Sequence, residues 1–342
     1  PRLRACDYPP RQRTHAASVG GPPAMQRGAS LQRAGSVRAG SNGTFYQDEE
    51  AELQVSTESA NTITTLLSSL ILKNEKATDG PTAWCSVSEE GLVFSVELAN
   101  TMRASARLSR ALFTEWRLND EAGSQGFGFG VNLGTLVECL RILSGKDENT
   151  LRISYNAAST KLRLTLVEGG AVTECDLGTL DTEEIVPVTE EACTARIVLE
   201  STLLSEALTD FQFGTDEKNQ RLRLRTGLQP PQLGLLVTSH DLGCEITYPP
   251  AALTSFDVSG DLEAEYSFAS VRMALRSLKE SDQTCLRLRE DGVLHLAVRI
   301  KAEELATELF VHFLLTPLVS VDELDLEEEE GEEEMGASTA GG

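Results

Sequence analysis

Basic side chains spaced one helical turn apart are the residues of this sequence best placed to do chemistry. Arg272, Arg276 and Lys279 recur at i, i+4 and i+7 within 268–279, opposite an apolar stripe that predicts a helix. A row of cations on one helix face can contact successive phosphate groups. An ordinary solvated face gives the same pattern, and we favour phosphate contact because the helix carries no acid.

Two further predicted helices end near basic residues. Apolar residues at helical spacing predict a helix over 131–143, and Asn132 can act as its N-cap. The same spacing predicts a helix near 58–72. A fourth helix, near 201–210, contains acids and no base. The cations at or beyond the ends of the first two helices are further candidates for phosphate contact, with solvated charges as the alternative: Arg141, Lys146, Lys73 and Lys76.

Acidic side chains offer one candidate for metal-dependent catalysis. A two-metal nuclease needs several carboxylates that converge on one site. Asp261 and Glu263 form one D-x-E pair at the start of a predicted strand, and no second acidic motif accompanies it. Acids at strand starts are common, so we interpret the pair as structural and the protein as non-catalytic. A metal-dependent 3′-5′ exonuclease stays open as an alternative.

Histidines and cysteines form no further catalytic or metal-binding pattern. The four His have no ligand spacing and no catalytic partner motif, and the seven Cys contain no C-x-x-C pair. An odd number of scattered Cys is typical of buried free thiols in a reducing compartment. We therefore expect no metal and no cofactor.

Charge is distributed unevenly along this chain, which has a formal net charge of −23. Residues 1–44 contain seven Arg and one acid, whereas Asp322–Glu334 contain ten acids and no base. A surface this acidic does not wrap DNA by bulk attraction. Any DNA contact therefore requires a local basic patch.

Both ends of the sequence are expected to lie outside the folded part. Residues 1–44 are rich in Arg, Gly, Ser and Pro without apolar periodicity, which predicts a disordered leader. Upstream sequence or an organelle transit peptide is the alternative. Residues 321–342 form an acidic tail that we also expect to be disordered. No apolar run reaches the length needed to span a bilayer.

The part between the two ends repeats its own pattern. A strand, a helix, several strands, a second helix and three strands are predicted over 45–177, and the same order returns over 195–320. The acidic segment 178–194 has no helix or strand pattern and is predicted to be an interdomain linker. The Gly-rich run 126–131 lacks a phosphate-loop pattern and is predicted to be a closely packed strand. We predict an α+β fold of two similar domains, each with two helices on one face of an antiparallel sheet.

Several segments resemble the sliding DNA clamps, which share this order of elements. NLGTLVECLRIL at 132–143 and FVHFLLTPL at 310–318 are similar to segments of the replication clamp. Other segments resemble the Rad-one family of the nine-one-one checkpoint clamp: VELANTMRASARLSRALFTEWRL at 96–118, LTLVEGGAVTEC at 164–175 and LVTSHDLGCEITYP at 236–249. The resemblance implies a duplicated DNA-clamp fold over about 45–320.

The resemblance also implies a function and partners. In that family the clamp is a heterotrimer with Rad-nine-like and Hus-one-like subunits, which a clamp loader places around double-stranded DNA. It acts in DNA-damage checkpoint signalling and DNA repair in the nucleus, with no membrane involved. Its helices would present a few Lys and Arg to phosphates without reading bases. A homotrimeric replication sliding clamp is the alternative.

In the clamp arrangement, the two terminal strands would be Ala171–Leu177 and Leu242–Tyr248. Both are short and rather apolar and carry no Lys or Pro, so neither is protected from pairing with another chain. We predict that each strand extends its sheet to a different neighbouring subunit. The predicted contact residues are Ala171, Val172, Thr173, Cys175 and Leu177 on the first strand, and Leu242, Cys244, Ile246 and Tyr248 on the second.

Overall fold

The computed structural model describes most of the chain between residues 51 and 318. The described residues are 51–71, 80–98, 101–119, 126–143, 150–168, 171–211, 220–239, 242–301 and 308–318. All of them belong to one unit of the fold, residues 35–342. The predictions for 1–44 and 321–342, and those for Lys73, Lys76 and Lys146, lie outside the described residues. Among the helices described, none is long and apolar enough to cross a membrane.

Nine strands of the first half form two antiparallel groups. A five-stranded sheet has the order β5-β1-β7-β8-β9, and the second group has the order β4-β3-β2-β6. Buried residues alternate with more exposed ones along β2 and β8, as expected for strands with one face on a core, whereas β3 is buried on both faces over most of its length. The bounds are β1 Leu53–Thr57, β5 Glu115–Leu118, β7 Leu151–Asn156, β8 Lys161–Glu168, β9 Ala171–Gly178, β2 Thr82–Ser88, β3 Gly91–Leu98, β4 Met102–Ser109 and β6 Phe127–Asn132.

The second half repeats this topology strand for strand. Its five-strand group has the order β14-β10-β16-β17-β18, and its four-stranded sheet has the order β13-β12-β11-β15. The internal duplication predicted from the sequence is thereby confirmed. The bounds are β10 Ala195–Glu200, β14 Ser255–Val258, β16 Ser281–Leu288, β17 Leu294–Ile300, β18 Leu309–Leu315, β11 Arg221–Leu228, β12 Pro231–Ser239, β13 Leu242–Tyr248 and β15 Leu262–Ser267.

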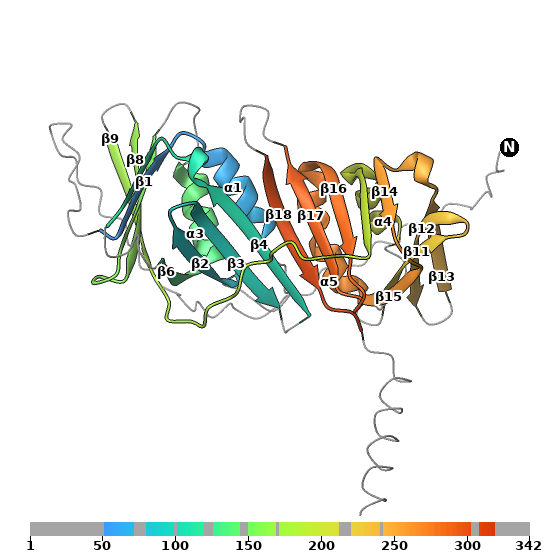
Figure 1. Cartoon of the computed structure of the whole chain (residues 1–342). Coiled ribbons are helices and arrows are strands. Elements are labelled where there is room, and N and C mark those ends of the chain that lie inside the picture. Colours follow the sequence, from blue (N-terminus) through green and yellow to red (C-terminus); the bar gives the residue numbers. More distant parts are fainter. Residues whose placement is uncertain are drawn as a thin grey trace, which may run out of the picture. The chain divides into compact units, whose positions relative to one another are not determined.

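One antiparallel pairing joins the two halves. β4 lies beside β18, with Ser105 opposite His312 and Ala104 opposite Phe313. The pairing merges four strands of the first half with five of the second into a nine-stranded sheet, visible across the centre of Figure 1. The prediction of one sheet in each half is therefore wrong, because each half divides its strands between an end sheet and this shared sheet.

Helices pack against the sheets in pairs. α1 (Ala60–Ser69) lies beside α3 (Leu133–Leu143), and α4 (Ser201–Asp210) lies beside α6 (Leu275–Lys279). Asn132 caps α3 as predicted, because its side-chain oxygen accepts the N–H of Thr135 at 2.8 Å. Apolar side chains at helical spacing are buried on α1, α3 and α4, which explains why their positions could be predicted, and α6 buries Leu278.

The helix predicted over 268–279 is divided into two. α5 (Phe268–Met273) ends at Met273, Ala274 is its C-cap, and α6 begins at Leu275. The N–H of Ala274 bonds to the carbonyl of Val271, three residues earlier, at 3.1 Å. This tighter turn changes the course of the chain at a fully buried alanine. Local propensity gives no warning of the break, since alanine is the best helix former.

The Gly-rich run forms strand β6 with close backbone packing, as predicted. A side chain on Gly128 would overlap the ring of Trp84, and one on Gly130 would overlap Leu180. Gly130 and Leu180 exchange two backbone hydrogen bonds, at 2.8 and 3.2 Å. Glycine therefore lets the chain after β9 lie directly against the sheet.

The segment between β9 and β10, residues 179–194, runs across the shared sheet and is here termed the connecting segment (Figure 1). Ser105 alternates with core-facing Ala104 and Ala106, so its hydroxyl points away from the core. That hydroxyl accepts the N–H of Val188 at 3.0 Å. The connecting segment thus covers the face of the shared sheet that is opposite the helices.

Candidate DNA-facing and subunit-contact surfaces

Two arginines from different halves of the chain approach one another where α3, α1 and α6 meet. Arg141 of α3 is exposed and donates a hydrogen bond to the hydroxyl of Ser68 in α1 at 3.2 Å. The pKa of Arg276 in α6 is lowered, first by partial burial and then by the charge of Arg141, while Glu280 acts in the opposite direction. Neighbouring like charges repel, so an anion bound beside both would be stabilised. The structure thereby brings together two of the predicted DNA-facing residues.

The other two described members of the predicted basic set lie in separate helices. Lys279 is exposed at the end of α6. Arg272 is half-buried in α5, and its guanidinium carbon lies 6.0 Å from the centre of the Phe268 ring. A cation at this distance from an aromatic face is attracted to it. The Arg272 guanidinium therefore already interacts with a side chain of its own helix.

The D-x-E pair makes structural contacts. A side-chain oxygen of Asp261 accepts the N–H of Leu228 at 2.7 Å, which secures the end of β11. Glu263 lies 3.0 Å from Arg223 and 4.0 Å from Arg225. The Glu263 carboxylate is thus paired with arginines, whereas in a nuclease it would need to bind a metal ion. Within the described residues, no group of three His, Cys, Asp or Glu could hold a metal.

Two histidines with no ligand spacing in the sequence lie together under the connecting segment. Nε2 of His295 is 3.0 Å from Nδ1 of His312, and His295 is only 3% exposed. Burial, then the charges of His312 and Arg287, lower the pKa of His295 to about 4. Arg287 in turn pairs with Glu190 of the connecting segment at 2.8 Å. The cluster holds a neutral imidazole pair at pH 7 beneath an ion pair.

Strand β9 is an edge of the five-stranded sheet. Ala171, Val172 and Thr173 are exposed, as a contact surface requires. Cys175 is half-buried, and Leu177 is buried in the core, so Leu177 could contribute only its backbone to a contact. This edge is therefore most accessible at its N-terminal end.

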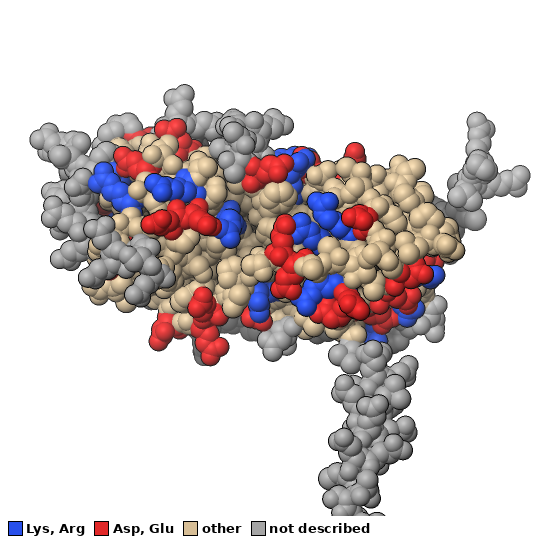
Figure 2. Space-filling model, in the orientation of Figure 1, with Lys and Arg blue, Asp and Glu red and all other residues tan. Residues whose placement is uncertain are grey.

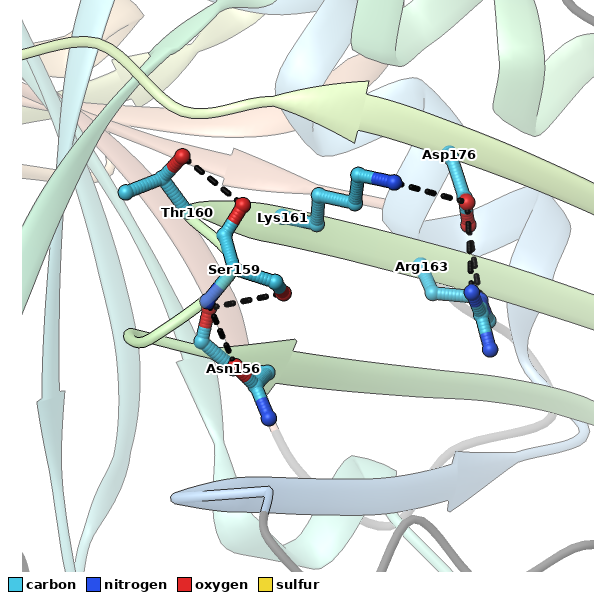
Figure 3. Close-up of polar contacts among 6 residues, drawn as sticks. All are labelled: Asn156, Ser159, Thr160, Lys161, Arg163 and Asp176. Carbon is cyan, nitrogen blue, oxygen red and sulfur yellow. Dashed lines mark hydrogen bonds and ion pairs between the residues drawn. The ribbon is translucent and has the colours of Figure 1, made fainter.

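The outer face of β9 is acidic. Asp176 is held by Arg163 at 2.7 Å and by Lys161 at 3.8 Å, as Figure 3 shows. The hydrogen bond and charge of Arg163 lower the pKa of Asp176. Glu174 lies on the same face and is exposed, and no described residue forms an ion pair with it. One acid of this edge is thus neutralised and the other is not.

Strand β13 is an edge of the four-stranded sheet. Leu242 is 55% exposed, whereas Cys244, Ile246 and Tyr248 are half-buried and pack against the core. The Tyr248 hydroxyl donates to the backbone oxygen of Leu203 at 3.1 Å, which places α4 behind this edge. Most of the predicted contact residues of β13 therefore face the hydrophobic core.

Acidic and basic side chains are interspersed on the face that carries the connecting segment (Figure 2). Many of them are paired, as Arg107 is with Glu90 and Arg299 with Asp282. Mixed charge of this kind gives little net attraction for DNA. The helix side, where Arg141 and Arg276 meet, is the better candidate for a nucleic-acid contact.

Comparison with known proteins identifies the family of the chain. The model of the family described as Repair protein Rad1/Rec1/Rad17 matches residues 52–300. The chain belongs to this Rad1 family. The human cell cycle checkpoint protein RAD1 is 23% identical over 283 residues, which cover 81% of this chain and 95% of the human protein. The DNA damage checkpoint control protein rad1 of Schizosaccharomyces pombe is 27% identical over 262 residues, covering 69% of this chain and 80% of that protein.

Solved structures show the fold of this Rad1-family chain. The Proliferating Cellular Nuclear Antigen from Entamoeba histolytica matches with a TM-score of 0.62 at 16% identity, covering 79% of this chain and 100% of that chain. The PCNA2-PCNA3 complex from Sulfolobus tokodaii matches with a TM-score of 0.60 at 13% identity, covering 77% of this chain and 98% of that chain. The predicted sliding-clamp fold is therefore confirmed.

The contact residues predicted for this Rad1-family chain leave out the outer faces of both edge strands. Most of them are apolar positions, many of which lie on the core. The acids between them, Glu174 on β9 and Glu245 on β13, are exposed. Their alternation with Cys175 and Cys244 was the signal that could have found them, because neighbouring residues of a strand face opposite sides.

Proposed function

We propose that this protein is the Rad1-type subunit of a heterotrimeric, ring-shaped checkpoint clamp. The ring encircles double-stranded DNA at damage sites and supports checkpoint signalling and DNA repair in the nucleus. The other subunits are of the Rad-nine and Hus-one kinds, and a clamp loader opens and places the ring. Support comes from the Rad1 family match, the clamp fold, and relatives named as checkpoint proteins.

The observation that carries this proposal is the pairing of β18 with β4. β18 ends the five-strand group of the second half, and β4 ends the four-strand group of the first. The strands at the corresponding positions of the duplicated topology are β9 and β13, and both are sheet edges. An unpaired edge can take up another strand. Neighbouring clamp subunits that pair with β9 and β13 would repeat the internal junction and close a ring.

The helix side supplies the contact with DNA. Arg141 and Arg276 lie together there although one comes from each half, and Lys279 and Arg272 follow on α6 and α5. Contacts of Lys and Arg with phosphate are independent of sequence and weaken with salt, so a ring can slide. Lys73, Lys76 and Lys146 are candidates for the same contact beyond the described residues.

The proposed role is non-catalytic. The exonuclease alternative needs carboxylates free to bind metal, whereas Glu263 is engaged by Arg223 and Arg225. The homotrimeric replication clamp is the other alternative, and it requires β9 of one copy to pair with β13 of another. The mass of the assembled complex distinguishes the homotrimer from the heterotrimer.

Sedimentation of the full chain, alone and with the two candidate partner subunits, tests the proposal. We expect a monomer alone, a one-to-one complex with each partner, and a one-to-one-to-one complex with both. Each partner should leave the binding site of the other unaffected, because the two edges are separate. A monomer that ignores both partners, or a homotrimer that forms unaided, would contradict the heterotrimer.

A further inference from the structure

The internal junction defines how a free β9 edge would align with a free β13 edge. In the junction, His312 of β18 lies opposite Ser105 of β4, and both side chains are on the face away from the core. β9 is the counterpart of β18, and β13 is the counterpart of β4. The residues of β9 and β13 that correspond to His312 and Ser105 would therefore meet.

Buried positions identify the counterpart of His312. Leu315 is the last buried residue of β18 and pairs with Leu294 at the start of β17. Leu177 is the last buried residue of β9 and pairs with Leu162 near the start of β8. His312 lies three residues before Leu315, and the residue three before Leu177 is Glu174.

The same comparison identifies the counterpart of Ser105. Ser105 lies between Ala104 and Ala106, which pair with the core residues Val96 and Phe94 of β3. In the second half, the equivalent core residues of β12 are Val237 and Leu235, and they pair with Cys244 and Ile246. The residue between this second pair is Glu245. A second copy of the chain that docked in the internal register would thus place Glu174 directly opposite Glu245.

Among the described residues of the two edges, no basic side chain is free to offset this opposition. On the β9 side, Lys161 and Arg163 are engaged with Asp176 (Figure 3). On the β13 side, neither β13 nor α4 contains Lys or Arg, and α4 adds Glu206 and Asp210. The nearest arginines of that sheet are in β11 and are paired with Glu263 and Glu265 of β15. Like charges directly opposite one another destabilise a strand pair.

We propose, building on the clamp assignment above, that Glu174 and Glu245 select the neighbours of this chain in the ring. They oppose edge-to-edge pairing of two copies, and each favours an unlike clamp subunit whose edge strand carries Lys or Arg at the opposing position. The exposed backbone edge and the exposed Leu242 supply affinity, while the two acids supply discrimination. This accounts for how a duplicated fold with two complementary edges avoids forming a homotrimer.

Charge-swap variants of the full chain test this inference by self-association. In Glu174→Lys and in Glu245→Lys, one acid faces one base in a homotypic pair, so each single variant should self-associate about tenfold more tightly than the wild type. The double variant Glu174→Lys/Glu245→Lys restores like charges and should return to wild-type behaviour. Sedimentation velocity over a concentration series, at low and high salt, gives the association constants, and salt should weaken the gain in the single variants.

A matched control separates local opposition from net charge. Glu89→Lys makes the same change in charge at an exposed turn between β2 and β3, and it should leave self-association unchanged. Equal gains in Glu89→Lys and Glu245→Lys, or a double variant that associates as strongly as the singles, would overturn the inference.

Hetero-assembly provides the second measurement. Each single variant should bind the partner at its own edge several-fold more weakly, while binding at the other edge is retained. Unchanged partner binding by both single variants would overturn selection by these acids and leave the clamp assignment intact. Failure of the wild-type chain to bind either partner would instead overturn the clamp assignment.

Discussion

Arg141 and Arg276 have a shared environment that favours a bound anion. Their mutual repulsion would be relieved by a phosphate that lies beside both. The effect is local, and it operates although the chain as a whole carries a net charge of −23. DNA binding should therefore depend on a few named residues rather than on the overall field.

Replacing Arg272, Arg276 and Lys279 with Ala should weaken DNA binding of the assembled clamp. Each lost phosphate contact should reduce the slope of log K against log salt by about one unit. Fluorescence anisotropy with a short duplex over a salt series measures the slope, and circular dichroism checks the fold. Arg110, Arg117 and Arg196, exposed bases outside the α-helices, provide a triple-Ala control. An unchanged slope in the first variant would show that its side chains are merely solvated.

The buried His295 predicts a loss of stability in mild acid. Its pKa is about 4 in the folded protein and about 6.5 in an unfolded chain, so between these values the unfolded state binds more protons. The contribution of His295 to the free energy of unfolding should therefore be fully present above about pH 6.5. As the pH drops toward 4, this contribution should fall by about 1.4 kcal/mol per pH unit. Urea midpoints at pH 7, 6 and 5 measure the slope.

The variant His295→Gln isolates this contribution from that of carboxylates. Gln can keep a hydrogen bond to His312 but does not titrate. The pKa values of Asp176 and Asp282 are also lowered, so these acids add their own loss of stability at lower pH in both proteins. Equal pH slopes for wild type and His295→Gln between pH 6.5 and 5 would show that His295 does not titrate as described.

Asp261 and Glu263 are engaged by groups of the protein itself, which predicts no nuclease activity. Purified protein with magnesium or manganese should leave end-labelled DNA intact, because the partners of Glu263 are arginines and not metal ions. The double variant Asp261→Ala/Glu263→Ala serves as the comparison. Degradation by the wild type that disappears in this variant would identify the pair as catalytic.

At the scale of elements, the two edge strands predict separable subunit contacts. Proline removes one backbone N–H and disturbs strand pairing, so Thr173→Pro should abolish binding at the β9 edge and Glu245→Pro binding at the β13 edge. Thr173→Ser keeps the N–H and is the control at the first edge. At the second edge Glu245→Gln loses the same charge as Glu245→Pro but keeps the N–H, so the difference between these two variants isolates the backbone contact. Sedimentation with one partner at a time shows which edge has been lost. Loss of both contacts from one Pro variant would indicate a general change in the fold.

Element positions could be predicted to the extent that they depend on local periodicity. The strand 242–248 and the helix 201–210 follow from alternation and from helical spacing, and the structure assigns these residues to β13 and α4. The break at Ala274 could not be predicted, since packing imposes it on a residue that favours helix. The β4–β18 pairing was also inaccessible, because backbone hydrogen bonds carry no information about which strand is the partner. The proximity of Arg141 and Arg276 depends on that pairing. Both arginines could therefore be predicted as candidates for DNA contact, but their proximity could not.

At the scale of the whole molecule, a duplicated chain with one internal junction and two free edges is suited to be one segment of the proposed closed ring. Two features reduce non-specific attraction to DNA: the acidic net charge and the interspersed charges on the face of the connecting segment. In the proposed ring, retention on DNA would come from enclosure more than from affinity. This distinguishes a ring from a protein that binds along one side of the duplex.

Enclosure predicts that retention depends on the topology of the DNA. The complete clamp, placed by its loader on a nicked circular plasmid, should remain bound at a salt concentration that abolishes its binding to a short linear duplex. Salt weakens phosphate contacts but does not open a closed ring. Gel filtration before and after cutting the plasmid measures the bound fraction, which should fall once the ring can slide off an end. Blocking both ends of the linear DNA with a bound protein should restore retention. Equal loss from circular and cut plasmid would show that phosphate contacts, and not a ring, hold the protein on DNA.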